Sequence, residues 1–363
     1  MADTDARVKK VLLVAPRMQA RGTSEYTVNL ARELKAAGLE VAVFCGPGRM
    51  LTMLEREGIP FRTFPYIEGF GLRCGARRSF LAAIAGFDPQ IIHVQGFTVA
   101  RALHPLRRGR SAALVLTAHW VPARCRRLHR LTRCFHGIIA TTQDVREELV
   151  NDCGVARGRV RVIPNGIDVA RLEEHEVPPI FRNAVPAVGS LGPIEEERGH
   201  ELFVRAAAIV MRRWPAVQFV IAGEGRELPG LTRLVGALGL DRAVTLARDL
   251  TAYEDVLDAL DVVVQSSQVD VSGYSILEAM GHGRPVIAFN TGTACEIIED
   301  RRTGLLVPKG EVEALAGAME SLIGNPSMAR QMGQNARQAV RDKFDVRTLA
   351  RQTLDYYTQL LSR

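Results

Sequence analysis

The sequence predicts an α/β protein with two domains, each built on a doubly wound parallel sheet. Short apolar runs typical of buried strands alternate with helical patterns along most of the chain. The alternation stops at a proline-bearing segment, residues 173–187, and then begins again. The 363 residues are enough for two domains of ordinary size. Strands that alternate with helices at this spacing indicate βαβ crossovers, which place parallel strands in one sheet.

The first domain is expected to span residues 1–172. Its first strand leads through a glycine-containing loop into a helix that Thr23 or Ser24 can cap. We expect strands at residues 11–14, 41–44, 61–64, 91–94, 113–117, 137–140 and 160–163, and helices at residues 24–37, 50–57, 79–85, 99–106, 124–133 and 144–152.

The second domain is expected to span residues 188–344, after the linker at 173–187. A last amphipathic helix, residues 346–361, ends the chain. We expect the other strands at residues 187–191, 218–222, 244–246, 262–264 and 285–288, and the other helices at residues 201–213, 228–238, 276–280, 312–323 and 327–340.

The most informative stretch of the second domain follows the apolar run at residues 262–264. A polar loop leads to Gly273, which directly precedes a helical pattern. Loops at the carboxyl ends of parallel strands bind ligands in open α/β sheets, and a helix N-terminus suits a phosphate. We therefore expect the backbone N–H groups of Tyr274 and Ser275 to face a phosphate. Glu278, about one turn into the helix, could accept hydrogen bonds from sugar hydroxyls, which together describes a nucleotide-sugar pocket.

Asp270-x7-Glu278, followed by EAMGHGRPVIAF and TGTACEII, resembles the E-x7-E signature of retaining glycosyltransferases of family 4. The resemblance covers nearly the whole chain. It implies the GT-B fold: two Rossmann-like domains facing a cleft, with the acceptor on the first domain and the nucleotide-sugar on the second. It also implies that the last helix crosses back onto the first domain, where Phe344, Tyr356 and Tyr357 would pack.

The resemblance assigns roles to residues of the second domain. Glu278 would hold the ribose hydroxyls, and Asp270, where the family has Glu, would lie against the donor sugar. The segment from Gly189-Ser190-Leu191 to Glu197-Arg198-Gly199 aligns with the family's GR…KG segment, whose cations neutralise the donor diphosphate. Arg198 keeps one of these cations. Ser190 replaces the other, which weakens stabilisation of the departing diphosphate.

Three further positions, Gly22, His119 and Gly223, match the family's pattern less specifically. Gly22 lies in the glycine loop after the first strand, where the backbone would approach the donor phosphate or the acceptor. His119 matches the active-site histidine near the donor sugar, with a strand-end histidine bonded to backbone as the alternative. His93, at another strand end, is better interpreted as structural. Gly223 matches the family's G-x-G turn, which implies a role in donor binding, and its surroundings do not fit a dinucleotide fingerprint.

The sequence offers no motif for a metal or a tightly bound cofactor. The only D-x-D match lies at residues 3–5, and no His, Cys or carboxylate cluster has metal-ligand spacing. We therefore expect a metal-independent enzyme whose substrate is a UDP- or GDP-linked sugar.

Charge is distributed unevenly between the two halves. Residues 1–180 carry 27 Lys and Arg against 17 Asp and Glu, a net charge of +10, whereas the remaining residues carry 20 and 23, a net charge of −3. Residues 71–133 hold twelve arginines and a single acid, Asp88. Arginine-rich codon usage is one explanation, but it would not remove acids from one segment. We expect this surface to meet something anionic, such as a phosphorylated lipid acceptor or an anionic membrane.

Composition favours a cytoplasmic protein. The chain is 47% hydrophobic, its six cysteines are scattered, and neither a signal peptide nor a run of about 20 apolar residues is visible. A peripheral position at the inner face of the membrane is compatible with the basic first half.

These observations predict a retaining, metal-independent hexosyltransferase that acts on a lipid-linked or polysaccharide (cell-envelope) glycan precursor. One alternative is a relative that still binds nucleotide-sugar but has lost turnover through Ser190 and Asp270. The other is a basic nucleic-acid-binding protein, against which the absence of a recognisable motif and the few aromatic residues argue.

Overall fold

A computed structural model describes most of the chain, and its contacts divide it into two compact units. Unit 1 comprises residues 1–166 and 346–363, and unit 2 comprises residues 167–345. The division lies between residues 166 and 167. Residues 167–172, which were expected to end the first domain, and the linker at residues 173–187 therefore belong to unit 2. The described residues are 8–19, 22–69, 74–103, 112–122, 129–174, 178–181, 185–248, 253–269 and 273–362.

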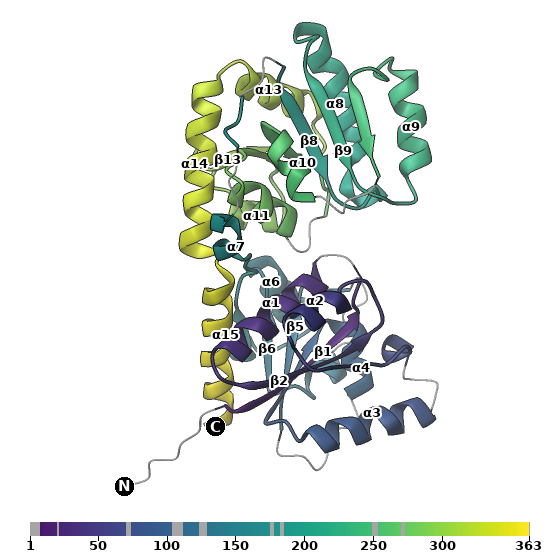
Figure 1. Cartoon of the computed structure of the whole chain (residues 1–363), viewed down its shortest axis with the longest axis vertical. Coiled ribbons are helices and arrows are strands. Elements are labelled where there is room, and N and C mark those ends of the chain that lie inside the picture. Colours follow the sequence, from purple (N-terminus) through teal and green to yellow (C-terminus); the bar gives the residue numbers. More distant parts are fainter. Residues whose placement is uncertain are drawn as a thin grey trace. The chain divides into compact units, whose positions relative to one another are not determined.

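Unit 1 is built on a seven-stranded parallel sheet in the order β3-β2-β1-β4-β5-β6-β7 (Figure 1). The strands are β1 (Lys10–Arg17), β2 (Glu40–Gly46), β3 (Phe61–Thr63), β4 (Ile91–Gln95), β5 (Ala113–Ala118), β6 (Gly137–Ala140) and β7 (Val160–Val162). The helices are α1 (Thr23–Ala36), α2 (Leu51–Arg56), α3 (Cys74–Phe87), α4 (Phe97–Leu103), α5 (His129–Thr132), α6 (Gln143–Asn151) and α15 (Val346–Leu361).

The two faces of this sheet differ in chemistry. One face packs an apolar core that includes Leu12, Phe44, Leu114 and Ile138. Side chains alternate between faces along a strand, and residues in register across parallel strands share a face. Because Gln95 is in register with Thr117, and His93 lies two residues before Gln95, these three polar side chains share the opposite face. All three are fully buried.

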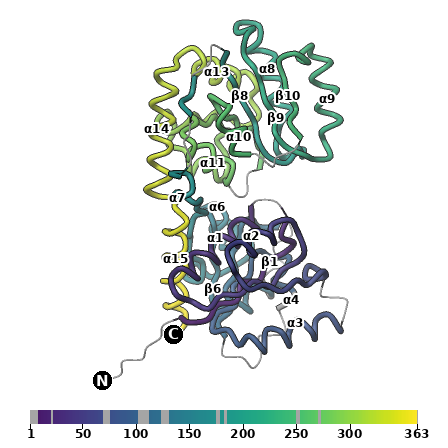
Figure 2. Tube along the Cα trace, in the orientation of Figure 1, coloured from purple at the N-terminus to yellow at the C-terminus, as the bar shows by residue number. Residues whose placement is uncertain are grey.

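Helix α15 covers this polar-bearing face together with α1. Figure 2 shows the two ends of the sequence, α1 in purple and α15 in yellow, side by side in unit 1, in agreement with their contacts. The Tyr357 hydroxyl lies 2.5 Å from His93 Nδ1, and the Tyr356 hydroxyl donates to the Arg159 carbonyl at 3.1 Å. The expected return of the last helix is therefore correct for both tyrosines. Phe344 is buried within unit 2, so its expected packing on the first domain is wrong.

Unit 2 is built on a six-stranded parallel sheet in the order β10-β9-β8-β11-β12-β13. Its strands are β8 (Ala187–Leu191), β9 (Gln218–Ala222), β10 (Val244–Ala247), β11 (Val262–Gln265), β12 (Val286–Phe289) and β13 (Gly304–Val307). Its helices are α7 (Val169–Glu174), α8 (His200–Arg213), α9 (Leu228–Ala237), α10 (Tyr253–Ala259), α11 (Tyr274–Gly281), α12 (Thr293–Ile297), α13 (Val312–Ile323) and α14 (Pro326–Lys343).

Both sheets are doubly wound, which confirms the predicted α/β class. The strand order reverses between β1 and β4 in unit 1 and between β8 and β11 in unit 2. In such sheets, ligands bind at the carboxyl ends of the strands beside this reversal. The strand order therefore predicts ligand-binding loops after β8 and β11 in unit 2 and after β1 and β4 in unit 1.

Candidate active site

The loops after β8 and β11 are bonded to each other at the carboxyl edge of the unit 2 sheet. The Ser266 hydroxyl donates to the Gly199 carbonyl at 2.8 Å and lies 3.3 Å from that of Arg198. Gly199 has φ 64°, and a Cβ there would collide with the Ser266 carbonyl. The glycine is therefore required both by its left-handed backbone and by the close approach. These contacts fix the backbone of Arg198, whose side chain is half-buried.

Ser190 lies beneath this turn, at the carboxyl end of β8. It is 1% exposed, and its Oγ is 3.2 Å from His200 Nδ1, while His200 Nε2 is 3.2 Å from the Pro193 carbonyl. Burial lowers the pKa of His200 to about 4, so the ring is neutral at pH 7. A carbonyl only accepts, so Nε2 carries the proton and the Ser190 hydroxyl donates to Nδ1. The Ser190 proton is thus directed to His200, away from any donor phosphate.

Gly223 allows two loops of unit 2 to pack closely. A Cβ at this position would collide with the Gly192 carbonyl, in the loop that follows β8. The Ile194 N–H donates to the Glu224 carbonyl at 2.8 Å and joins the same two loops. Close backbone packing is therefore sufficient to explain this glycine, and its expected contact with the donor stays a prediction.

Helix α11 begins at the carboxyl edge next to β11. Gly273 precedes it with φ 64°, and a Cβ there would collide with the side chains of Ile297 and Thr293. The first turn of a helix leaves N–H groups that no preceding turn can satisfy, so Tyr274 and Ser275 lie where an anion is stabilised.

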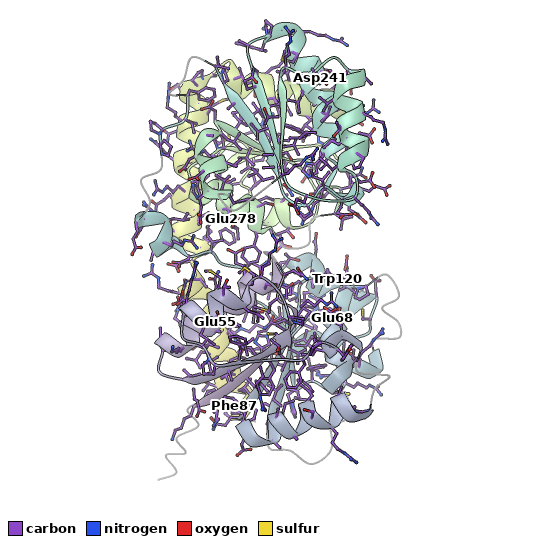
Figure 3. The ribbon with its side chains drawn as sticks, turned by 45° about the vertical axis from the view of Figure 1, so that its right-hand side comes forward. Glu55, Glu68, Phe87, Trp120, Asp241 and Glu278 are labelled. Atoms are coloured by element: carbon purple, nitrogen blue, oxygen red, sulfur yellow. The ribbon has the colours of Figure 1, made fainter. Side chains whose placement is uncertain are left out.

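One strip of α11 is not fully buried. Six of its eight residues are buried, and the two that remain half-buried are Ser275 and Glu278, three positions apart on one face. Figure 3 labels Glu278. Glu278 is the residue for which the sequence predicted contacts with sugar hydroxyls. Asp270 lies outside the described residues.

A buried ionic cluster holds the far end of α11. His282 Nδ1 lies 3.0 Å from Asp258 Oδ1, and a guanidinium nitrogen of Arg284 lies 3.6 Å from the same oxygen. His282 and Arg284 are 2% and 1% exposed. No local sequence pattern reveals this cluster, because its partners are more than twenty residues apart.

An acidic cavity of about 240 Å³ also lies in unit 2. Four of its lining residues are glutamates, at positions 195, 196, 201 and 227. Arg226 pairs with Glu195 at 2.7 Å, and Arg205 pairs with Glu201 at 2.7 Å. An acidic lining repels a diphosphate, so this cavity is not the candidate donor site.

In unit 1, two predicted residues lie at the carboxyl ends of strands. Gly22 precedes α1 with φ 65°, and its carbonyl accepts from the Tyr26 N–H at 2.9 Å. His119 follows β5 and is 4% exposed, next to Trp120, which is 44% exposed (Figure 3). The Tyr26 ring meets the His119 ring edge-on, with centroids 4.9 Å apart. Burial lowers the pKa of His119 to about 4.

His93 is a structural residue, as the sequence analysis favoured. Its Nδ1 and Nε2 lie 2.5 Å from the Tyr357 hydroxyl and from Thr117 Oγ1, respectively. Burial, followed by the proximity of His119, lowers the pKa of His93 to about 3. With both ring nitrogens bonded inside the core, His93 has no capacity left for a ligand.

The described residues contain no group of three or more His, Cys, Asp or Glu side chains that could hold a metal ion. Across the same residues, no helix is long and apolar enough to cross a membrane. The absence of such a metal-binding group among these residues does not test the expected metal independence, which stays a prediction.

Two family models match the chain, one to each half. The model described as Glycosyltransferase Family 4 matches residues 20–171, and the model described as Glycosyl transferases group 1 matches residues 173–339. The chain belongs to the family 4 type of glycosyltransferases. The two parallel Rossmann-like sheets are those of the GT-B fold of this family, as the motifs predicted.

Two curated relatives show how far the likeness of this glycosyltransferase extends. Alpha-D-kanosaminyltransferase of Streptomyces kanamyceticus is 32% identical over 177 residues, which are 48% of this chain and 46% of that relative. The match therefore spans about half of each protein. D-inositol 3-phosphate glycosyltransferase of Pseudarthrobacter chlorophenolicus is 27% identical over 366 residues, covering 87% of this chain and 85% of that relative.

A solved structure shares the fold of this glycosyltransferase. Anabaena Alr3699/HepE, crystallised in complex with UDP-glucose, superimposes with a TM-score of 0.83 at 20% identity. The match covers 96% of this chain and 100% of that chain.

Proposed function

We propose that this glycosyltransferase moves a hexose-type sugar from a nucleotide diphosphate sugar to a hydroxyl acceptor. The observation that carries the proposal is the carboxyl edge of the unit 2 sheet at β8 and β11. There, the turn that holds Arg198 is bonded to the loop after β11, and α11 presents Ser275 and Glu278 on its half-buried strip.

Each group at this edge has a role suited to such a donor. Arg198 and the first turn of α11 would neutralise the diphosphate, whose charge grows as the sugar departs. Glu278 would accept hydrogen bonds from the ribose hydroxyls, and Asp270 would lie against the donor sugar. We further propose that configuration is retained, with the leaving diphosphate helping to deprotonate the acceptor hydroxyl on the same face, and that no metal takes part.

Relatives support this class of donor and acceptor. Alr3699/HepE was crystallised with UDP-glucose, and the relatives' names include a poly(ribitol-phosphate) α-N-acetylglucosaminyltransferase and a lipopolysaccharide core biosynthesis glycosyltransferase. We infer a UDP- or GDP-linked sugar and a glycan or lipid-linked acceptor. The net charge of +10 in residues 1–180 supports a cytoplasmic enzyme that meets an anionic membrane surface, with no specific nucleic acid as partner.

A second candidate function rests on Ser190. The family's cation is missing at this position, and the hydroxyl that replaces it donates to His200. A protein that binds nucleotide-sugar but transfers the sugar slowly, or not at all, would fit this observation. Stable nucleotide binding without turnover would identify it.

The deciding experiment is a thermal-shift panel of UDP, GDP and ADP with their sugar conjugates, with and without Mg²⁺. A ligand at 100 times its dissociation constant stabilises the fold by about 2.7 kcal/mol. We expect a metal-independent shift with one nucleotide, and its loss in Glu278→Ala. Glu254→Ala is the control, because Glu254 pairs with Arg171 at the surface of the same unit. No shift with any nucleotide would refute the proposed donor site.

A further inference from the structure

Gln95 and His119 form a buried polar pair at the carboxyl edge of the unit 1 sheet. Gln95 is the last residue of β4, in register with Thr117 of β5, and His119 follows Thr117 by two residues. The side chains of Gln95 and His119 therefore lie on the same face of the sheet. Gln95 is 0% exposed and His119 is 4% exposed.

The contact between them determines which ring nitrogen of His119 carries the proton. His119 Nε2 lies 3.4 Å from Gln95 Oε1. An amide oxygen only accepts hydrogen bonds, so Nε2 must donate, and in a neutral ring Nδ1 is then an acceptor. His119 Nδ1 and Gln95 Nε2 are both buried, and neither has a hydrogen-bond partner among the described residues.

The groups that face this pair favour a neutral ring. Tyr26 of α1 packs edge-on against His119, and His93 of β4 and Tyr357 of α15 lie on the same side of the sheet. Burial raises the pKa of Tyr26 to about 12 and raises that of Tyr357 well above its ordinary value, so both phenols stay protonated. His93 and His119 themselves have lowered pKa values. Near pH 7 these four side chains are therefore polar but uncharged.

We propose that Gln95 is a positioning residue, which holds His119 as the Nε2–H tautomer so that Nδ1 accepts a hydrogen bond from a hydroxyl group of the substrate. The inference rests on the proposed function and on the match of His119 to the family's active-site histidine. It assigns the ligand at Nδ1 to a hydrogen-bond donor such as a sugar hydroxyl. A phosphate oxygen, which only accepts, does not fit this tautomer.

A spectroscopic test examines the tautomer without any reaction. With ¹⁵N-labelled histidine, NMR distinguishes a protonated from an unprotonated ring nitrogen, and His119→Gln assigns the signals. We expect the proton of His119 on Nε2 in the unaltered protein and a mixture of tautomers in Gln95→Leu. A proton on Nδ1 in the unaltered protein would mean that the amide donates to the ring, which would overturn the proposal.

A kinetic test uses the isosteric substitution Gln95→Glu. A carboxylate beside Nε2–H favours the imidazolium and raises the pKa of His119 above its value of about 4. An imidazolium has no lone pair that can accept a hydrogen bond from a hydroxyl. The decrease of kcat on the acidic side of its pH dependence, the acid limb, should therefore move to higher pH. The matched control is Gln90→Glu. Gln90 lies just before β4, and its side-chain Oε1 accepts from the Lys9 and Lys10 N–H groups, so that variant should keep the original pH dependence.

The two steady-state constants separate positioning from donor binding. Gln95→Leu should lower kcat about tenfold, the value of one hydrogen bond, while KM for the nucleotide-sugar stays within about twofold. An unmoved acid limb in a folded, active Gln95→Glu variant would refute the role of Gln95. Absence of transfer by the unaltered protein would instead refute the proposed function and leave the NMR result standing.

Discussion

Ser190 shows how one side chain can occupy a family position without keeping the family's chemistry. The residue is 1% exposed, and its hydroxyl donates to a histidine that burial keeps neutral. An arginine at this position would need the space that His200 now fills. Under the proposed function, Arg198 and the N-terminus of α11 would take over the electrostatic role of the family's cation.

Ser190→Ala tests this interpretation. Removing the hydroxyl leaves His200 Nδ1 buried without its donor, which should lower the free energy of unfolding by about 1–3 kcal/mol. Nucleotide affinity should change less than twofold, because the hydroxyl does not serve the donor. Urea unfolding and nucleotide titration measure the two effects. A tenfold loss of affinity at unchanged stability would show instead that Ser190 binds the donor directly.

The turn between β8 and α8 shows how a short element positions the site. Gly199 has a left-handed backbone and lies against the Ser266 carbonyl, so the loops after two neighbouring strands share one anchor. The position of Arg198 therefore depends on a glycine next to it as well as on its own side chain.

A pair of glycine substitutions separates backbone strain from this contact. Gly239 has φ 68° and nothing within 4 Å of a Cβ, so Gly239→Ala should cost about 1 kcal/mol from the left-handed conformation alone. Gly199 has a similar φ of 64°, and an alanine Cβ there would also force the Ser266 carbonyl away. Gly199→Ala should be more destabilising and should weaken nucleotide binding, whereas Gly239→Ala should leave binding unchanged. Equal effects of the two variants on binding would contradict the anchoring role.

The longer elements could be predicted from the sequence because their signals are local. α15 spans Val346–Leu361 as expected, and α8 and α9 differ from expectation by one residue at one end. α10 and α12 were not predicted, since seven and five residues are too few to show a helical period. The prediction of a site at residues 273–278 rests on a local signal of the same kind. The hydrogen bonds from Ser190 to His200 and between Gln95 and His119 join residues that a loop or the strand register brings together. No local sequence pattern reveals such pairs.

The two units share a dependence on buried neutral histidines. Burial lowers the pKa of His93 to about 3 and those of His119 and His200 to about 4. In the unfolded chain these side chains bind protons near pH 6.5, so below that pH the unfolded state gains more protons than the folded state. Their contribution to stability is therefore complete above about pH 6.5 and decreases as the pH falls towards 4.

Urea unfolding at pH 8, 7, 6 and 5 measures this dependence. We expect the midpoint to be constant between pH 8 and 7 and to fall between pH 6 and 5. His93→Gln, which removes one titrating ring from the core, should reduce the slope relative to the unaltered protein. An equal midpoint at pH 7 and pH 5 would contradict the assignment of neutral buried rings.

The bond between Tyr357 and His93 also orders events during synthesis. The seven strands described for unit 1 have left the ribosome once residue 162 has emerged, yet α15, which covers their polar face, is translated only after the whole of unit 2. Until then, His93 has no tyrosine partner, and the nascent sheet exposes the face that α15 will cover. Unit 2, whose residues are contiguous, can complete its fold first. Unit 1 can therefore complete its fold only after residues 346–361 have emerged.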